Sequence, residues 1–360
     1  MMNQKLFKCA DCDHEWTISD ELTFKSISKN RRFIGNYFYN DSKKQVLCPI
    51  CGEGKLFRIF VGSYGQLIRR PLTDMRDNKS YVLFPGCTLT TSAREYYVST
   101  LEVLNFLGIN YNEMEDWNCC GSSVGSLDLA WSLVLNARNL EIASKQGDVV
   151  FTPCSCCYKN MTKTVEDLGI NPAFRDMVEA KGIKVNLMPV KHLAEVIVKD
   201  YGLERVKDKV NTPLKGLKVA TYYGCQMTRP HSNFDHPFYP TSLDKLAGVL
   251  GAEVIDFPYK TKCCGGPILL TNEDMALTLA YKILMAAKKT GADVIQTACP
   301  LCSMTLDLYQ KRIEEKFGEK FNIPVVYFTQ LMGLAFGIRK KALGFDKNVV
   351  SPKKLLMQFS

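Results

Sequence analysis

Two stretches of the sequence decide the fold: DVVFTPCSCC at residues 148–157 and DVIQTACPLC at residues 293–302. Each contains a short run of β-branched and aromatic residues that ends in a small residue or proline and then a cysteine. Such a run is typical of a buried strand that brings a thiol to its carboxyl end. Two further stretches have the same form, SYVLFPGC at residues 80–87 and KVATYYGC at residues 218–225. The pattern occurs twice in the same order, which indicates a duplicated domain.

The cysteines repeat with similar spacing in both copies. Each copy has one isolated cysteine, then a Cys-Cys-Gly, then a Cys-x-x-Cys. In the first copy 31 residues separate Cys87 from Cys119, and in the second 37 residues separate Cys225 from Cys263. The gap from the cysteine pair to the Cys-x-x-Cys is 33 residues in the first copy and 34 in the second. Two matching sets indicate a shared chemical role.

Helical patterns lie between the expected strands. Apolar residues recur at intervals of three and four in residues 93–107, 127–146, 243–250 and 273–290,. Residues 185–187 and 324–328 are the expected closing strands of the two copies. Strands that alternate with helices predict an α/β fold with mostly parallel sheets, covered on both faces. The loops at the carboxyl ends of such strands open on one edge, where the thiols of one copy can meet.

These patterns divide the chain into four predicted parts. Residues 201–217 are polar and carry turn residues, so we expect the linker between the two copies there,. The parts are a small metal-binding extension (1–75), a first domain with its Cys-Cys-Gly (76–205), a second such domain (206–345) and a basic carboxyl-terminal tail (346–360).

Five thiols per copy exceed what a simple metal site needs. Four thiolates suffice for a zinc ion or for a cubane [4Fe–4S] cluster. Cys119 and Cys120 point in different directions on an extended backbone, so both reach one centre only if it is large or if one sulfur bridges two irons. Gly121, Gly265 and Gly266 follow the cysteine pairs and allow a tight turn around a bulky centre,. The pattern favours an iron–sulfur centre larger or more open than a cubane. A zinc site in one copy, or buried free cysteines, are the alternatives.

The motifs around these cysteines resemble those of a known family. PGCTL (85–89), EDWNCCG (115–121), YGCQMTRP (223–230) and CCGGP (263–267) are similar to the catalytic B subunit of heterodisulfide reductase, over roughly residues 80–337. The resemblance implies a noncubane [4Fe–4S] cluster with five cysteine ligands in each copy, one of them bridging. It also implies that the two clusters face each other and split a disulfide in two one-electron steps. The implied ligands are Cys87, Cys119, Cys120, Cys154 and Cys157 for the first cluster, and Cys225, Cys263, Cys264, Cys299 and Cys302 for the second.

The chain departs from the family pattern at three places. Gln226 stands where many relatives have histidine after the cysteine, so Arg229 and His231 become the catalytic candidates that bind an anionic group or supply a proton,. Cys156 has Leu301 as its counterpart in the second copy, which favours a structural or adventitious thiol. The chain also lacks the Cys-x2-Cys-x2-Cys-x3-Cys-Pro run of a ferredoxin-type cluster,. The resemblance then implies two partners, a ferredoxin-like C subunit and a flavin-containing A subunit.

Two Cys-x-x-Cys knuckles in the extension predict a separate metal site. The first holds Cys9 and Cys12, the second holds Cys48 and Cys51, and 35 residues lie between them. Four thiolates at this spacing favour zinc, which would also stabilise so small a domain. Rubredoxin-type iron is the alternative and would make the extension an electron carrier. The basic residues of the extension could contact nucleic acid, but docking of the extension to a partner subunit is the favoured role.

The composition is that of a globular protein, with 46% hydrophobic and 23% charged residues in 360,. No apolar run approaches the roughly 18 residues of a spanning helix, and the first residues lack the apolar core of an export signal. Fifteen cysteines, an odd number, argue against a disulfide framework,. We therefore expect a cytoplasmic protein without a membrane span. Its net charge of +9 only weakly suggests an acidic partner or an anionic substrate,.

The expected function is that of an oxidoreductase acting on sulfur groups within a multi-subunit complex. It would cleave or form a disulfide, or oxidise a sulfane-sulfur or thiol substrate. The alternative is a non-catalytic electron relay or scaffold, in which the clusters pass electrons without binding a substrate.

Overall fold

The computed structural model describes residues 79–229 and 234–359, together with the strands of residues 1–78. The chain divides into two compact units, Met1–Asn78 and Lys79–Ser360. Among the described residues, no helix has both the length and the apolar character needed to cross a membrane.

The first unit contains two antiparallel sheets. One has the strand order β2-β1-β6-β7 and the other the order β3-β4-β5. The predicted metal-binding extension stays a prediction, because Cys12, Cys48 and Cys51 lie outside the described residues and Cys9 is known only as the last residue of β1. The strands are β1 (Lys5–Cys9), β2 (Glu15–Ile18), β3 (Arg31–Ile34), β4 (Tyr37–Asn40), β5 (Gln45–Val46), β6 (Leu56–Val61) and β7 (Leu67–Pro71).

The second unit contains two parallel four-stranded sheets, one from each copy of the sequence pattern. Their strand orders are β11-β10-β8-β9 and β13-β12-β14-β15, and every pairing is parallel. Each sheet is therefore built from strands of a single copy, which confirms the predicted α/β duplication. The strands are β8 (Tyr81–Leu83), β9 (Tyr111–Glu113), β10 (Val149–Thr152), β11 (Val190–His192), β12 (Lys218–Tyr222), β13 (Glu253–Val254), β14 (Val294–Thr297) and β15 (Val325–Tyr327).

Helices cover both sheets of the second unit. All four residues of β10 and all four of β14 are buried, as expected for central parallel strands with helices on both faces,. The predicted helices are present within a few residues of the expected ends. The helices are α1 (Gly86–Thr90), α2 (Arg94–Leu107), α3 (Leu129–Ser144), α4 (Ser155–Ile170), α5 (Pro172–Glu179), α6 (Leu193–Glu195), α7 (Leu203–Lys207), α8 (Ser242–Val249), α9 (Glu273–Lys289), α10 (Pro300–Ser303), α11 (Gln310–Phe317), α12 (Phe328–Ala335) and α13 (Lys353–Gln358).

Local sequence signals explain where the longer helices begin. The side chain of Asp128 accepts a hydrogen bond from the backbone N–H of Trp131 at the start of α3. Asn272 does the same for Met275 at the start of α9. Such caps satisfy backbone donors that the first turn of a helix leaves without a partner. The helix that follows each Cys-Cys-Gly is thus started in the same way in both copies.

One predicted strand was wrong. The closing strand of the first copy is β11, whereas residues 185–187 form no strand. Two polar residues of β11 obscured it in the sequence. The ammonium of Lys191 is paired with the carboxylate of Asp200 at 2.6 Å, and His192 Nδ1 accepts a hydrogen bond from the backbone N–H of Ala194 at 3.1 Å. Because both polar side chains find buried partners, the strand does not need an apolar sequence.

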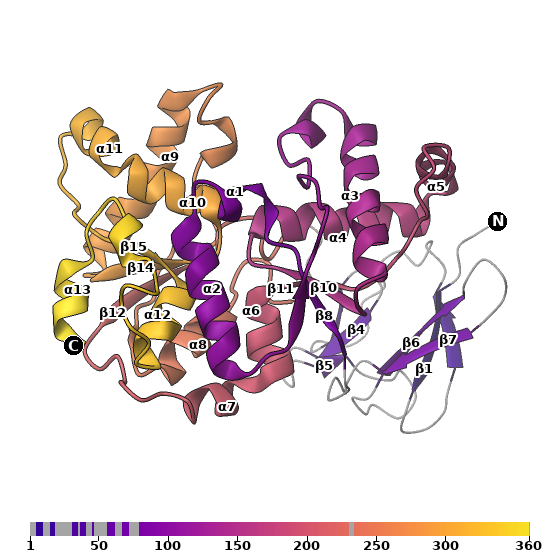
Figure 1. Cartoon of the computed structure of the whole chain (residues 1–360), viewed down its shortest axis with the longest axis horizontal. Coiled ribbons are helices and arrows are strands. Elements are labelled where there is room, and N and C mark those ends of the chain that lie inside the picture. Colours follow the sequence, from indigo (N-terminus) through magenta and orange to yellow (C-terminus); the bar gives the residue numbers. More distant parts are fainter. Residues whose placement is uncertain are drawn as a thin grey trace. The chain divides into compact units, whose positions relative to one another are not determined.

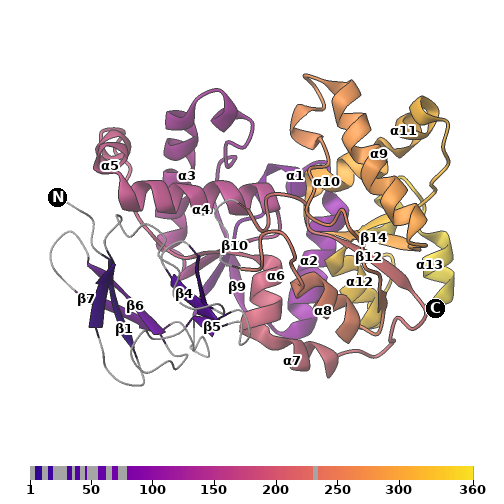
Figure 2. The ribbon, with the colours of Figure 1, turned by 180° about the vertical axis from the view of Figure 1, so that it is seen from behind.

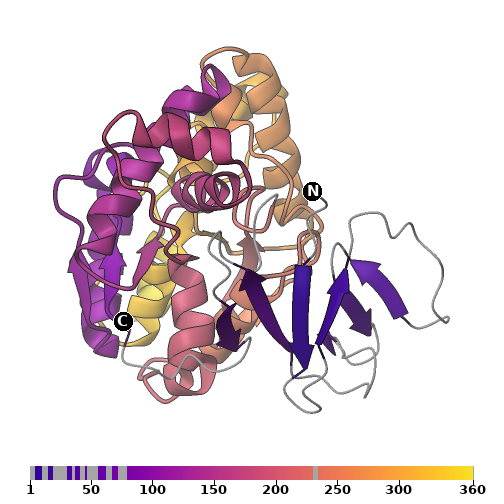
Figure 3. The ribbon, with the colours of Figure 1, turned by 90° about the vertical axis from the view of Figure 1, so that its right-hand side faces the viewer.

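The two copies pack together through α2 of the first and the segment from β15 to α12 of the second. The rings of Tyr96 and Tyr327 stack with centroids 3.9 Å apart, and the hydroxyls of Ser99 and Thr329 are 2.7 Å apart. All three ribbon views show the first copy, in purple and magenta, beside the second, mostly in orange and yellow (Figures 1, 2 and 3). Residues of both copies therefore belong to one continuous hydrophobic core.

Candidate metal centre

The repeated cysteines follow the central strands of both sheets. Cys87 lies in α1, which follows β8, and Cys154 is the N-cap residue of α4, which follows β10. The second copy repeats this with Cys225 after β12 and with Cys299 as the N-cap residue of α10. In each sheet these two strands are neighbours, and the strand order reverses between them. Ligands of open parallel sheets bind at such a switch point, at the carboxyl ends of the strands.

The five thiols of the first copy form a connected set. The sulfurs of Cys87 and Cys119 are 3.8 Å apart. Hydrogen bonds from Cys119 and Cys157 hold the pKa of Cys120 well below its ordinary value. Hydrogen bonds to Cys120 and Cys154, together with burial, hold the pKa of Cys157 well above its ordinary value. The structure therefore brings all five predicted ligands of the first copy together.

The second copy repeats this arrangement. Hydrogen bonds from Cys225 and Cys264 lower the pKa of Cys263, and the backbone N–H of Gly265 donates to its sulfur at 3.4 Å. Hydrogen bonds to Cys264 and Cys299, with burial, raise the pKa of Cys302 well above its ordinary value. The five predicted ligands of the second copy therefore also lie together.

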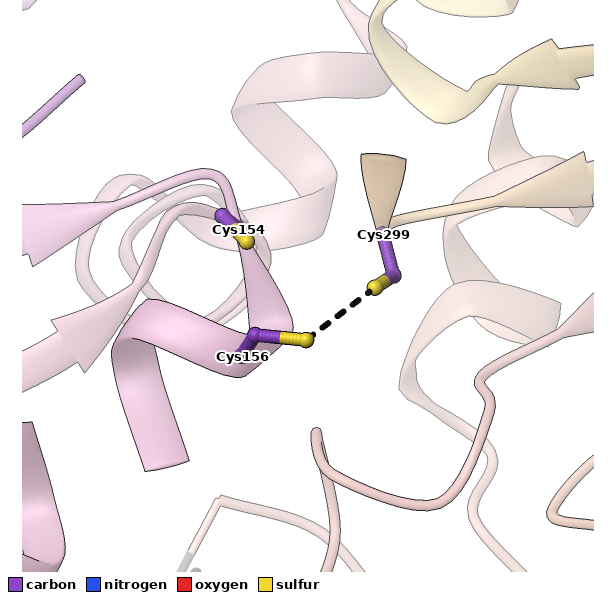
Figure 4. Close-up of side chains that lie close together, drawn as sticks. All are labelled: Cys154, Cys156 and Cys299. Carbon is purple, nitrogen blue, oxygen red and sulfur yellow. Dashed lines mark hydrogen bonds between the residues drawn. The ribbon is translucent and has the colours of Figure 1, made fainter. Parts of the chain in front are cut away.

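The two sets of thiols meet between the two sheets. The sulfurs of Cys154, Cys156 and Cys299 all lie within 4.8 Å of one another, and all three residues are buried. Figure 4 shows Cys154 and Cys156 at the start of α4, opposite Cys299. The candidate centre is therefore a pair of adjacent thiol clusters.

A glycine before the first cysteine of each copy makes room for the last one. Gly86 has φ +74°, and a Cβ added there would lie 3.0 Å from the sulfur of Cys157. Gly224 has φ +69°, and its Cβ would lie 3.1 Å from the sulfur of Cys302. Both positions need glycine for its left-handed backbone and for its lack of a side chain. Sequence reasoning noticed the glycines after the cysteine pairs but missed these two.

Neighbouring polar groups hold the cysteine loops in place. The amide of Asn136 donates to the carbonyl of Cys120 at 2.8 Å, and that of Asn160 lies 3.8 Å from its sulfur. The hydroxyl of Tyr222 donates to the carbonyl of Lys262 at 2.6 Å, just before the second cysteine pair. These contacts fix the direction of the thiols, as hydrogen bonds to the ligands of metal sites do.

The donor set fits an iron–sulfur centre. Cys120, Cys154, Cys157 and their counterparts in the second copy are buried, whereas Cys87 and Cys119 are exposed. Several thiolates crowded into a dry site repel one another, and a cationic centre removes that repulsion and keeps them ionised. Soft thiolates at this density select iron–sulfur clusters or zinc.

Of the two catalytic candidates, the structure describes Arg229 but not His231. Arg229 is partly buried, donates from Nη2 to the carbonyl of Thr261 at 2.5 Å and lies over the ring of Phe238. His231 lies outside the described residues. Gln226 lines a pocket with all five thiols of the second set, and its buried Oε1 has no hydrogen-bond partner among the described residues.

Sequence reasoning also missed a buried polar group between the copies. The hydroxyl of Ser155 donates to the carbonyl of Ala298 at 3.1 Å and lies 3.4 Å from Nε2 of His192. The hydroxyl of Tyr96 donates to the carbonyl of Pro153 at 2.8 Å. Burial lowers the pKa of His192 to about 4, so its ring is neutral at pH 7,. These contacts tie the Cys154 and Cys299 loops to each other, and no sequence motif marks them.

Comparisons with known proteins agree with this geometry. A family model described as a cysteine-rich domain, CCG, matches residues 81–162 and 219–307. The membrane anchor subunit of 8-methylmenaquinol:fumarate reductase from Wolinella succinogenes is 36% identical, over 77% of this chain and 99% of that protein. The B subunit of ferredoxin:CoB-CoM heterodisulfide reductase from Methanosarcina mazei is 30% identical, over 74% of this chain and 93% of that protein.

A solved structure shares the fold. A hypothetical protein from Helicobacter pylori superposes with a TM-score of 0.61 at 16% identity, covering 77% of this chain and 53% of that chain. The doubled cysteine-rich domain and the identity to the Methanosarcina protein over nearly its whole length show that this chain belongs to the family of heterodisulfide reductase B subunits.

Proposed function

We propose that the chain is the catalytic redox subunit of a heterodisulfide-reductase-like complex. Each set of five cysteines would hold one noncubane [4Fe–4S] cluster. The protein would cleave or form a disulfide, or oxidise a sulfane-sulfur or thiol substrate. When bound, the two clusters would supply the two electrons of disulfide cleavage, one at each sulfur of the substrate.

The main support for this proposal is that the cysteines of the first copy lie next to those of the second. The sulfurs of Cys154 and Cys299 come from different copies and lie within 4.8 Å of each other. Two centres built on these sets would be adjacent, so both sulfurs of one disulfide can be reached at the same time. A protein that only relays electrons does not need two matching cysteine sets placed side by side. The duplicated sheet order and the duplicated glycines, Gly86 and Gly224, support two equivalent half-sites.

The residues around the sulfurs keep water out and the ligands in place. Tyr96, Tyr222 and Tyr223 are fully buried beside the cysteine loops. A dry surrounding strengthens electrostatic interactions and shields reactive sulfur species from water. We keep Arg229 and His231 as the candidates that bind an anionic group of the substrate or supply a proton, because both follow the second copy's first cysteine closely in sequence.

A relative favours a second candidate function. The Wolinella protein, 36% identical to this chain, is named as a subunit of a quinol:fumarate reductase, a reaction in which no disulfide is named. This supports the alternative that the chain relays electrons between other subunits without binding a substrate. The two functions differ in whether both clusters are needed for turnover.

The partners follow from the same reasoning. The Methanosarcina relatives are named as subunits of heterodisulfide reductases, and the names of three of them include ferredoxin. We propose a ferredoxin-like C subunit and a flavin-containing A subunit as the partners. The amino-terminal extension would bind one zinc through Cys9, Cys12, Cys48 and Cys51, or rubredoxin-type iron in the alternative.

Replacing one cysteine of each pair tests the function. Cys120→Ser and Cys264→Ser exchange a thiolate for a harder, poorer iron ligand, so each should damage only its own cluster. The assay follows reduction of CoB-CoM heterodisulfide and of small thiol disulfides by the full chain, with a chemical reductant in place of the partner subunits. We expect almost complete loss of turnover in both variants.

The untouched cluster is the control in each variant. Iron analysis and electron paramagnetic resonance must show that it remains before turnover is compared. Near-normal turnover in either variant would refute the paired-cluster function and favour the relay, because two half-reactions at adjacent centres need both centres.

A further inference from the structure

Cys156 is the cysteine that the duplicated pattern leaves without a role. It lies in the first turn of α4, between Cys154 and Cys157, and Leu301 takes its place in the second copy. Its residue is only 6% exposed. The sequence favoured a structural role for it, but its surroundings show a more specific one.

The thiol of Cys156 faces the second copy. On a helix, adjacent side chains point about 100° apart, so Cys156 and Cys157 diverge. Cys157 contacts Cys120 of the first set. The sulfur of Cys156 lies 3.9 Å from that of Cys299, and Figure 4 shows it pointing from α4 toward that sulfur. It also lies within 4.8 Å of the sulfur of Cys154, a member of the first set.

Cys156 also lines the pocket of the second set. That pocket is lined by all five thiols of the second copy, whereas Cys156 is the one cysteine of the first copy that the described part of the chain contributes to it. A distance of 3.9 Å suits a hydrogen bond from an S–H group to a sulfur acceptor,. The second copy has no equivalent donor toward the first at this position, because Leu301 carries none.

The first set has a different side-chain donor. The amide of Asn160 lies 3.8 Å from the sulfur of Cys120. Its counterpart in the second copy is Thr305, whose hydroxyl donates to the carbonyl of Leu301 at 2.9 Å. The two copies therefore differ in how their sulfurs are hydrogen-bonded, although their cysteines match.

Resting on the proposed function, we infer that Cys156 is a positioning residue of the second site, donating a hydrogen bond to the Cys299 thiolate and raising the reduction potential of the cluster held there. Hydrogen bonds to the sulfurs are one of the factors that set the potential of iron–sulfur centres. A donor stabilises the reduced, more negative form more than the oxidised form. The second site thus receives from the first copy a donor that its own sequence lacks.

The test compares Cys156→Ala with Cys156→Ser in full-length, anaerobically purified protein. Each is combined with Cys120→Ser, which leaves the second cluster, and with Cys264→Ser, which leaves the first. Redox titrations followed by electron paramagnetic resonance give the midpoint potential of the remaining cluster. With the second cluster alone, Cys156→Ala should make the potential more negative at unchanged iron content. Cys156→Ser keeps a donor and should restore much of the shift.

With the first cluster alone, Cys156→Ala should cause a smaller shift or none. An unchanged potential in the second cluster, or an equal or larger shift in the first, overturns the inference. Loss of iron from the second site in both Cys156 variants would show that Cys156 is a ligand and would also overturn it. Absence of iron–sulfur clusters from the wild-type chain is a different result, because it refutes the proposed function before Cys156 is varied.

Discussion

Gly86→Ala should displace a ligand of the first site. Gly86 and Gly108 have similar left-handed backbones, with φ +74° and φ +68°. An added Cβ at Gly108 meets nothing within 4 Å, whereas at Gly86 it meets the sulfur of Cys157 at 3.0 Å. The two alanine variants therefore share the backbone cost and differ in the contacts at Gly86, of which the Cys157 sulfur is the nearest and the ring of Phe84 follows at 3.4 Å.

The magnitudes follow from these geometries. A left-handed backbone costs an L-residue about 1–2 kcal/mol, which is the whole expected effect of Gly108→Ala. Atoms pack best at about 3.5–4.0 Å, so in Gly86→Ala the Cys157 sulfur must move by roughly 0.5–1 Å, and such overpacking adds about 1–3 kcal/mol. Metal–ligand distances lie within about 0.2 Å of their preferred values, so a shift of this size takes the sulfur out of ligand distance. We therefore expect Gly86→Ala to lose most iron from the first site.

Iron content per chain and electron paramagnetic resonance after anaerobic purification measure this loss, and urea unfolding of the iron-free chains measures the difference in stability. Gly224→Ala, with its Cβ 3.1 Å from the sulfur of Cys302, should empty the second site instead. Its control is Gly318→Ala, which has φ +68° and no atom within 4 Å. If Gly86→Ala keeps as much iron as Gly108→Ala, the glycine does not set the position of Cys157 and the reasoning is refuted.

Three other results are expected. Burial raises the pKa of Asp307 to about 6, although backbone N–H groups of Val349 and Val350 donate to it, so the folded state holds this proton more tightly than the unfolded state. Urea unfolding should show that wild-type stability falls by about 2 kcal/mol relative to Asp307→Asn as pH rises from about 4 to 6, and parallel curves would contradict this. Lys191→Met should cost about 3–5 kcal/mol of unfolding free energy, because Asp200 loses its buried cationic partner and keeps the Tyr81 hydroxyl as a donor,; Lys288→Met, in an exposed pair, should cost less than about 1 kcal/mol and is the control,. Metal analysis of the full chain should find about eight irons and one zinc; four irons would mean that one set holds no cluster, and additional iron in place of zinc would favour rubredoxin-type iron.

The sequence by itself determined the duplicated fold, and together with the family resemblance it predicted the membership of both cysteine sets. Strands such as β10 and β14 are short runs rich in β-branched residues whose pattern is local, and a cysteine placed just after a parallel strand must lie at the carboxyl edge of its sheet,. The cysteine spacing in each copy therefore predicted which five thiols lie together, although the packing of the helices and sheets was not known. The same local reasoning failed for β11, where Lys191 and His192 are polar and are buried only because other groups pair with them.

Only the tertiary structure decided how the two sets relate. Their contact depends on how α2 packs against α12, and the stacked rings of Tyr96 and Tyr327 are too far apart in sequence for any periodic pattern to pair them. That packing brings Cys154 close to Cys299 and turns Cys156 toward the second copy. A helix face shows in the sequence that it must be buried, but not which partner covers it, because burial of apolar surface is non-directional.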